Sequence, residues 1–345
     1  MSLHDVRTVP YRDGLLSASA PADLERRQSP ADPLCLDPAT LRRDAPDQHW
    51  MLPGARGELR ARCSLWWTRT PSLLGHRLGL IGHYAARDVA AGGLLLERAC
   101  RELARRRCSV AVGPMDGSTW RRYRLVTERG GEPTFFLEPD NPDDWPDHFL
   151  ALGFQAVAHY ISAVNSDLGR EDPRVSHIAE RLSAQGIRIR PLDPQRAKDD
   201  LRRIYAVSAV SFRNNFLYTP IPEADFLAQY RALLPALRPE LVLIAEAADQ
   251  PVGFIFAVPD LKQAERGRRV DTVVVKTLAV LPDRARVGLG SLLLAACQDT
   301  ARQLGYTRAI HALMHEQNAS RNLSRRYAQP MRRYALFAKT LGARP

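Results

Sequence analysis

Lysine is nearly absent from this sequence. Only four of its 49 basic residues are Lys, the other 45 are Arg, and the formal net charge is +11. Such a charge favours an anionic partner. No DNA- or RNA-binding motif accompanies the basic clusters, and one of them, residues 105–107, reads equally well as a solvated helix end. The missing motif therefore argues against a nucleic-acid partner, whereas the net positive charge is compatible with a small anionic ligand.

Cysteine pairs and long apolar runs are missing as well. The five cysteines include no Cys-x-x-Cys pair, which argues against a metal site and a disulfide framework and favours a reducing compartment. No apolar run approaches the roughly 18 residues that a membrane-spanning helix needs. Residues 1–7 do not have the pattern of a signal peptide. We therefore expect a cytoplasmic protein without a membrane partner and without a metal.

The most informative stretch covers residues 271–318. An apolar strand over residues 273–280 leads into a basic turn that ends in Gly288-Leu289-Gly290. A helix follows, in which apolar residues recur at a spacing of about 3.6 and which Gly305 would end. Two glycines at a helix start let backbone N–H groups approach a ligand without interference from Cβ atoms. Together with the positive end of the helix dipole, these groups predict a site for a phosphate or pyrophosphate.

A Gly-x-Gly turn is weak evidence alone, because many such turns only reverse a strand into a helix. A dinucleotide-binding fingerprint would place a third glycine where this chain has Leu293. The strand, the Arg-rich turn, Gly288-Leu289-Gly290, the helix and Asn318 after the next strand together resemble the GCN5-related N-acetyltransferase (GNAT) superfamily. The chain departs from the family at Ala285, where the loop usually carries Gln or Arg.

This resemblance implies an α/β fold and a co-substrate, acetyl-coenzyme A or another acyl-coenzyme A. The pyrophosphate would lie in the loop between the strand and the helix, the thioester carbonyl at a backbone N–H of the strand, and the pantetheine arm at the Asn. The coenzyme-binding residues that it implies are Leu278, Ala279, Val280, Arg284, Arg286, Val287, Gly288, Leu289, Gly290, Ser291 and Asn318.

Transfer of an acyl group to an amine needs an acid for the departing thiolate. In the family this acid is usually a Tyr seven residues after the Asn, but that position is Arg325 here. Tyr327 is therefore the candidate acid, and Tyr334 is the nearby alternative. A buried structural role is the competing interpretation of Tyr327.

The reaction also needs a base for the ammonium proton. His315 is the candidate, because a His titrates near pH 7 and this one lies where the two central strands separate in the family. Glu316 and Asp271 are the alternatives. His311 lies two strand periods earlier, on the same face, and is expected to contact the acceptor. So are Asn215, Phe216 and Tyr218, in a connection that covers the acceptor site in the family.

An earlier segment repeats the organisation of residues 271–318. When Gly93 is aligned with Gly290, the Ala-Cys pair at 99–100 meets the identical pair at 296–297. This internal similarity predicts two copies of one fold. In the first copy Ala91 replaces the first glycine and no Arg-rich turn precedes it, so its pyrophosphate site is expected to be degraded.

The predicted fold is α/β: two tandem GNAT-like domains, each a mixed, mostly antiparallel twisted sheet flanked by helices. The predicted organisation is a partly irregular N-terminal extension over residues 1–48, a degenerate domain over 49–165, a linker helix over 166–186 and a catalytic domain over 187–345. The length of the chain accommodates two such domains.

The function that follows is a coenzyme A-dependent N-acyltransferase, in the first place an N-acetyltransferase, which moves the acyl group directly to a small-molecule amine in a ternary complex. One alternative takes a longer acyl chain from coenzyme A or from an acyl-carrier protein. The other is a non-catalytic regulatory protein that binds acyl-coenzyme A. The two copies would form an internal pseudo-dimer in a monomer, with a homodimer as the alternative.

Overall fold

A computed structural model of the chain describes residues 16–18, 32, 34–56 and 58–342. Much of the predicted N-terminal extension lies outside these residues. Of that extension the structure gives a short strand, β1 (Leu16–Ala18), and a helix, α2 (Pro38–Asp44). The Asp37 carboxylate accepts a hydrogen bond from the Ala39 amide, and this cap fixes the start of α2.

The strands of the described residues form one continuous sheet of 13 strands. Besides β1 these are β2 (Gln48–Pro53), β3 (Leu59–Trp66), β4 (Leu78–Ala86), β5 (Val110–Gly113), β6 (Leu125–Glu128), β7 (Gln155–Asn165), β8 (Ile187–Pro191), β9 (Val242–Ala247), β10 (Gln250–Pro259), β11 (Thr272–Val280), β12 (Arg308–His315) and β13 (Gln329–Thr340). Their order is β1-β2-β3-β4-β5-β13-β7-β12-β11-β10-β9-β8, and β6 pairs with β13 beside this path. The pairs β4–β5 and β11–β12 are parallel, and the other described pairs are antiparallel.

The same order of elements occurs twice along the chain. In the N-terminal half, the antiparallel strands β2, β3 and β4 lead into the helix α3 (Val89–Arg105) and then into β5, parallel to β4. In the C-terminal half, β8 to β11 lead into the helix α9 (Leu289–Gln303) and then into β12, parallel to β11. The predicted fold class, α/β with a mostly antiparallel sheet flanked by helices, is confirmed, but the two expected sheets are one continuous sheet.

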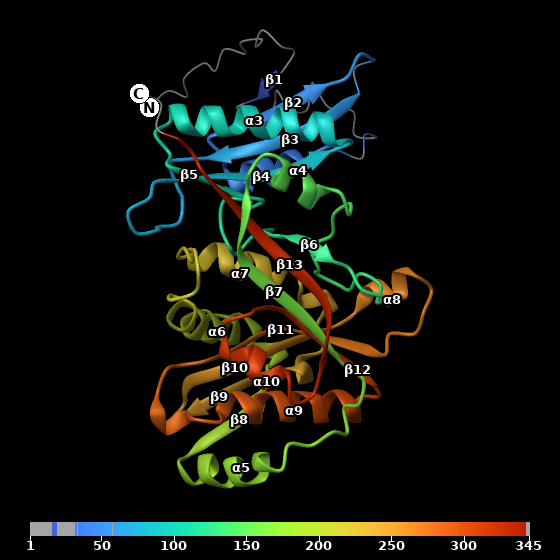
Figure 1. Ribbon diagram of the computed structural model, residues 1–345. Coiled ribbons are helices and arrows are strands. Elements are labelled where there is room, and N and C mark those ends of the chain that lie inside the picture. Colours follow the sequence, from blue (N-terminus) through green and yellow to red (C-terminus); the bar gives the residue numbers. More distant parts are fainter. Residues whose placement is uncertain (1–15, 19–31, 33, 57, 343–345) are drawn as a thin grey trace.

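The last strand of each half pairs with the other half. The strand β7 belongs to the N-terminal half in sequence but pairs with β12, whereas the C-terminal strand β13 pairs with β5. The two strands also pair with each other and cross the middle of the molecule in Figure 1. This exchange joins the halves into one sheet across the predicted boundary at residue 165.

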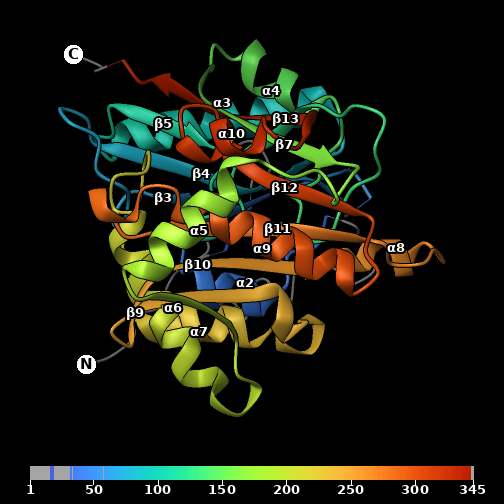
Figure 2. The ribbon, with the colours of Figure 1, turned by 90° about the horizontal axis from the view of Figure 1, so that it is seen from below.

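Helices cover both faces of the C-terminal sheet (Figure 2). Along β10, Phe254 and Phe256 pack under α6 (Ala197–Ser211) and α7 (Glu223–Arg231), while Ile255 and Ala257 face α9. This alternation is the period of two that a strand imposes on its side chains. The helix α5 (Arg174–Ala184) lies against α9, within the segment predicted as a linker helix.

In the N-terminal half, α3 and the short helix α4 (Trp145–Ala151) pack on one face of the sheet. The apolar stripe of α3 is completely buried there, with Leu95, Leu96 and Leu103 against β3 and β4. The remaining helices are α8 (Leu261–Glu265) and α10 (Ala319–Ser324). Among the described residues, the helices are all too short or too polar to cross a membrane.

Candidate active site

The two parallel strands of the C-terminal half separate part of the way along. They pair from Thr272 opposite Arg308 as far as Val275 opposite His311. Beyond that point Lys276 to Leu278 on β11 and Ala312 to His315 on β12 both line a cleft of about 1100 Å³. Because β11 has no strand partner on this side after Val275, alternate backbone amides of its free edge face the cleft. These amides are hydrogen-bond donors beside the point of separation.

A bulge in β12 holds the strands apart. The register between β12 and β7 shifts between His311 and Met314, and Leu313 has a positive φ of 58°. Both backbone groups of Leu313 are fixed from the other half: its amide donates to Ser162 Oγ at 3.0 Å, and its carbonyl accepts from Arg124 Nη1 at 3.1 Å. The opening is therefore part of the packed structure.

The helix α9 begins at this end of β11 without a side-chain cap. Its N-cap, Gly288, has φ 92° and no side chain to occupy the first amides. Arg181 of α5 donates to the carbonyls of Ala285 (3.1 Å) and Val287 in the turn before the helix. The positive φ strains any residue with a side chain, and a Cβ at Gly288 would also lie 3.0 Å from Ile178, so this position favours glycine.

The predicted coenzyme residues divide into two groups. Leu278 and Asn318 line the cleft. Asn318 is the N-cap of α10 but its side chain makes no capping hydrogen bond, so the amide is available to a ligand. Eight others do not line it and follow along the strand and the turn: Ala279, Val280, Arg286, Val287, Gly288, Leu289, Gly290 and Ser291. The Arg284 side chain lies outside the described part of the structure.

Two of these residues have partners within the protein. Arg286 lies 3.5 Å from Asp283 in an exposed ion pair, and Ser291 Oγ accepts a hydrogen bond from Arg326 at 3.2 Å. Gly290 has room beside it: a Cβ there would meet Leu278 and Leu323 at 3.8 and 3.9 Å, an ordinary contact distance.

The two histidines of β12 lie on the cleft wall in different environments. His311 is 3% exposed, and burial lowers its pKa to about 4, so the ring is neutral at pH 7. Its Nδ1 lies 2.8 Å from Ser324 Oγ, and its Nε2 is buried without a hydrogen-bond partner among the described residues.

His315 is neutral as well, because burial and the nearby Arg124 lower its pKa. Its Nδ1 accepts a hydrogen bond from the Gln317 amide at 3.1 Å. Since a backbone amide can only donate, the neutral ring carries its proton on Nε2. His315 thus offers a donor, and the base role predicted for it would require loss of the Gln317 bond.

The other predicted catalytic residues do not line the cleft. Tyr327 is 5% exposed in the core beneath α9, its hydroxyl has no partner among the described residues, and burial raises its pKa. Glu316 forms an ion pair with Arg333 at 3.0 Å. The alternative acid, Tyr334, is fully buried and donates to Glu138. This placement does not support Tyr327 as the acid that reaches the thiolate.

The predicted acceptor residues do line the cleft, together with residues of the N-terminal half. Asn215, Phe216 and Tyr218 follow α6, and the Tyr218 ring packs edge-on against Trp120 with centroids 6.0 Å apart. Trp120, which follows β5, also lines the cleft. Its ring is partly buried beside the cleft and its Nε1 donates to the Thr219 carbonyl at 2.8 Å.

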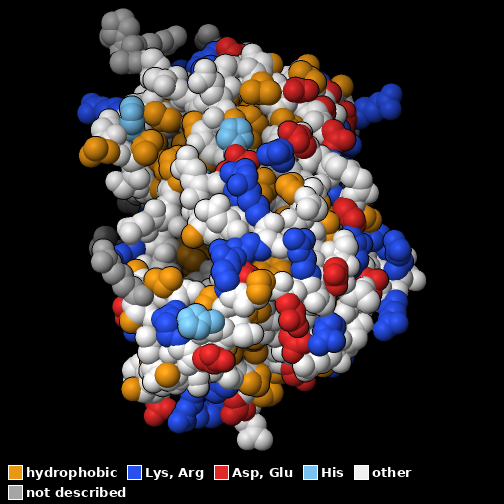
Figure 3. All heavy atoms as spheres, turned by 60° about the horizontal axis from the view of Figure 1, so that its bottom comes forward, with side chains coloured by type: hydrophobic (Ala, Val, Ile, Leu, Met, Phe, Trp, Pro, Cys, Tyr) orange, Lys and Arg blue, Asp and Glu red, His pale blue; other side chains and the backbone are white. Residues whose placement is uncertain are grey.

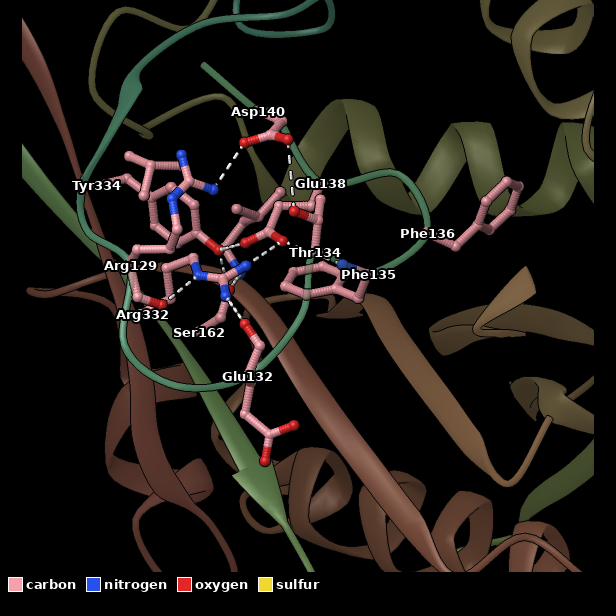
Figure 4. A network of polar contacts seen from close by, with 12 residues as sticks. Arg129, Glu132, Thr134, Phe135, Phe136, Glu138, Asp140, Ser162, Arg332 and Tyr334 are labelled. Carbon is pink, nitrogen blue, oxygen red and sulfur yellow. Dashed lines mark hydrogen bonds and ion pairs between the residues drawn. The ribbon is translucent and has the colours of Figure 1, made fainter. Parts of the chain in front are cut away.

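A buried polar network fixes the N-terminal wall (Figure 4). Arg332 of β13 and Glu138, both with side chains 0% exposed, form an ion pair of 2.5 Å. Arg332 also donates to the carbonyls of Arg129 (2.8 Å) and Glu132. The Tyr334 hydroxyl donates to Glu138 and lies 3.0 Å from Ser162 Oγ, which holds the Leu313 amide. The network thus connects the bulge in β12 to the loop that carries Phe135 and Phe136 into the cleft wall.

Sequence reasoning missed Arg124, Glu138 and Tyr160, which reach the cleft from this half. They are far from β12 in sequence, and no periodicity or motif marks them. The one signal in the sequence was the internal repeat. It predicts two copies of the fold, and residues of one copy can then contribute to a site of the other where the two copies meet.

The equivalent region of the N-terminal half is closed. The N-terminus of α3 is capped by Asp88, which accepts from the Ala91 amide at 2.8 Å. The chain after β5 stays against β4, where the Met115 amide donates to the Ile81 carbonyl at 2.9 Å and a Cβ at Gly82 would lie 2.2 Å from the Met115 carbonyl oxygen. Neither the uncapped helix nor the gap between strands exists there.

Residues 202–327 match the family model described as Acetyltransferase (GNAT) family. No curated protein sequence matches the chain significantly. Among solved structures, a GCN5-related N-acetyltransferase from Sphaerobacter thermophilus is 16% identical with a TM-score of 0.50 over 96% of this chain and 97% of that one. A tandem GNAT protein from the clavulanic acid biosynthesis pathway is 11% identical with a TM-score of 0.50 over 96% of this chain and 100% of that one.

A third similar structure is the glucosamine N-acetyltransferase region of a fungal multi-domain β-N-acetylglucosaminidase. It is 13% identical, with a TM-score of 0.55 over 98% of this chain. The chain spans 40% of that protein. At these identities the likeness shows a shared fold.

Proposed function

We propose that this chain is a member of the GCN5-related N-acetyltransferase superfamily and that it transfers an acyl group, in the first place acetyl, from coenzyme A to a small-molecule amine. One observation carries the proposal: β11 and β12 separate after Val275 and His311 into a cleft, and the neighbouring helix α9 starts without a cap. A thioester and an amine could meet in such a gap, with the anionic end of the coenzyme at the helix.

The first turn of α9 would hold the pyrophosphate. Uncapped N–H groups and the helix dipole favour a phosphate at this position, and Gly288 and Gly290 leave the backbone accessible. The pantetheine arm would follow the free edge of β11 past Leu278, within reach of the Asn318 amide. The thioester would then lie where the strands separate.

The reaction is direct attack of the amine nitrogen on the thioester carbonyl. The new C–N bond forms, the C–S bond breaks, and the thiolate takes a proton while the amine loses one. A backbone amide of β11 would stabilise the negative charge on the carbonyl oxygen. The four described cysteines other than Cys35 are buried and no cysteine lines the described cleft, which supports transfer without an acyl-enzyme.

His315 is proposed as a hydrogen-bond donor to the charge that develops in the transition state, because its neutral ring presents Nε2–H. The amine would bind as its free base, with water in the open cleft carrying the protons. In this proposal neither Tyr327 nor Glu316 contacts the substrate.

Release of free thiol from acetyl-coenzyme A over a panel of amines tests the proposal, together with calorimetric binding of acetyl-coenzyme A. We expect one coenzyme per chain, turnover with a subset of the amines, and intersecting initial-rate lines. Binding without turnover across the panel would instead support a regulatory coenzyme A-binding protein. Absence of binding would remove the proposal.

A longer acyl donor is the second candidate, and the size of the cleft favours it. Ligand pockets commonly measure ~300–1,000 Å³, and this cleft of about 1100 Å³ has a wall of Phe135, Phe136 and Phe212. The same assay with octanoyl- in place of acetyl-coenzyme A separates the two donors. A higher kcat/KM for the octanoyl donor would assign the apolar wall to the acyl chain.

A further inference from the structure

Arg124 is a buried cation in the proposed acceptor region without a counter-ion. The residue is 6% exposed and lines the cleft. The one hydrogen bond of its side chain goes from Nη1 to the Leu313 carbonyl, and its Nε is buried without a partner among the described residues. Among the described residues, no carboxylate lies within ion-pair distance of it. A guanidinium that is largely withdrawn from water without a negative charge beside it is costly, and an anion entering from the cleft would lower that cost.

The surroundings hold this guanidinium in place without neutralising it. Its carbon Cζ lies 3.8 Å from the Tyr123 ring centroid and 3.9 Å from the Tyr160 ring centroid, and the two rings meet at 83°. Cation–π contacts attract the charge but do not accept hydrogen bonds in the guanidinium plane. The backbone also adopts the left-handed region at Arg124, with φ 72°. Strain of this kind is frequent where a side chain has a functional position.

The cleft as a whole is basic. Its lining holds five Lys or Arg side chains and two carboxylates, and two of the arginines, Arg43 and Arg121, already pair with the Asp44 carboxylate. Of the carboxylates, Glu138 is already paired with Arg332, and Asp116 lies 3.9 Å from His83 Nε2. Lys276 of β11 faces the Tyr230 ring at 5.0 Å, and no carboxylate among the described residues pairs with it. A free anionic group would therefore meet attraction in this cleft and little repulsion.

We propose that the acceptor is an amine that also carries a carboxylate, and that Arg124 binds this carboxylate through the N–H groups in its plane. The proposal rests on the proposed function. Arg124 contacts the β12 bulge two residues before His315, whose ring packs on Tyr160 with centroids 5.0 Å apart. An acceptor held there by its carboxylate would keep its amine beside the gap between the strands. The coenzyme phosphates would lie at α9 instead.

Matched acceptors test the charge requirement. Amino acids are compared with their carboxamides and with aminophosphonates as acceptors, in wild type, Arg124→Gln and Arg124→Lys. We expect wild type to prefer the carboxylate by ~10- to 100-fold in kcat/KM, as a charge-assisted hydrogen bond allows. Arg124→Gln should lose this preference through a raised KM for the acid alone, and Arg124→Lys should keep part of it. Arg106→Gln, which removes an exposed arginine over the Trp67 ring outside the cleft, is the matched control and should change nothing.

Binding gives a readout that does not depend on turnover. Calorimetric titration of the preferred amino acid into the protein, with and without coenzyme A, should show affinity in wild type and loss of it in Arg124→Gln, while acetyl-coenzyme A binds both equally. Melting temperatures establish that each variant is folded. Equal use of acid and carboxamide by wild type, an unchanged preference in Arg124→Gln, or a preference for the phosphonate would each overturn the inference. No coenzyme binding by wild type would instead refute the proposed function.

Discussion

The two halves of the molecule are built to one plan and differ at the same two places. In the C-terminal half α9 starts at an uncapped glycine, and β11 and β12 separate beside it. In the N-terminal half the Asp88 carboxylate occupies the first amides of α3, and the chain after β5 stays bonded to β4. A negative side chain at the helix start satisfies the amides that would otherwise bind a phosphate.

The difference teaches how a duplicated fold can lose a site and keep its scaffold. A capping residue and a tightly packed strand end close the N-terminal site without disturbing the helix, the sheet or the core. This half is then free to serve the other: it supplies β7, the Ser162 hydroxyl that fixes the bulge in β12, and Arg124 at the cleft wall.

The largest effect is expected at the junction of the halves. Arg332→Met leaves the buried Glu138 without its cation and should lower the free energy of unfolding by about 3–5 kcal/mol. The neighbouring Arg333 pairs with Glu128 and Glu316 at the surface, so Arg333→Met should cost less than about 1 kcal/mol. Urea unfolding measures both. If the two variants lose equal stability, or if the halves unfold in separate transitions, the network does not join them.

A second contrast tests the two helix starts with one substitution. Gly290→Glu places a carboxylate in the first turn of α9, where the structure has room for a side chain and the helix dipole favours it. It should weaken acetyl-coenzyme A binding by roughly 100-fold, since two phosphates are repelled at short distance. Gly93→Glu makes the same change at the aligned position of α3, where a Cβ meets open space, and should leave binding unchanged. Calorimetry on both variants decides; a similar loss from Gly93→Glu would assign a coenzyme site to the N-terminal half.

Acid should destabilise the protein through histidines buried in both halves. Burial lowers the pKa of His311 to about 4 and that of His49 well below its usual value. As pH falls below about 6.5, these histidines become protonated in the unfolded chain but stay neutral in the folded protein. The free energy of unfolding is therefore highest near pH 7 and declines between pH 6.5 and 4. For His311 the loss from pH 7 to pH 5 is about 2 kcal/mol. His311→Asn and His49→Asn should each flatten the profile of unfolding free energy against pH; an unchanged slope would contradict the assigned burial.

The smallest effect concerns the cap that closes the N-terminal site. Asp88→Ala removes the hydrogen bond to the Ala91 amide and the ion pair with Arg60, at a cost of about 1 kcal/mol in unfolding free energy. It should not create a second coenzyme site, because the gap between β4 and β5 stays filled by residues 113–116. The binding stoichiometry measures this directly. Two coenzymes per chain would show that the cap alone closes the N-terminal site.

The distribution of charged side chains on the surface is relevant to the expectation that the protein does not bind nucleic acid. On the face drawn in Figure 3, Lys and Arg side chains are interspersed with Asp and Glu over both halves. Many basic residues pair locally, as Arg101 does with Glu97 and Arg302 with Asp299. On this face the basic side chains are therefore mixed with acidic ones.

The sequence alone determined the local features of the chain. Neighbouring residues predict three elements of the site: the strand at 273–280, the turn with Gly288 and Gly290, and the helix that follows. Such predictions succeed because apolar periodicity and glycine affect the backbone over only a few positions. The same holds for the alignment of Gly93 with Gly290, which predicted the second copy of the fold.

Only the tertiary structure decided the long-range features: the exchange of β7 and β13, the burial of Tyr327 beneath α9, and the approach of Arg124 to β12. A strand pairs by backbone hydrogen bonds that any sequence can make, so its partner is not encoded in the strand itself. An arginine buried against a distant carbonyl looks the same in sequence as one in solvent. The strand, turn and helix of the candidate site could thus be predicted from neighbouring residues. The cleft wall that the N-terminal half provides depends on how the two halves pack.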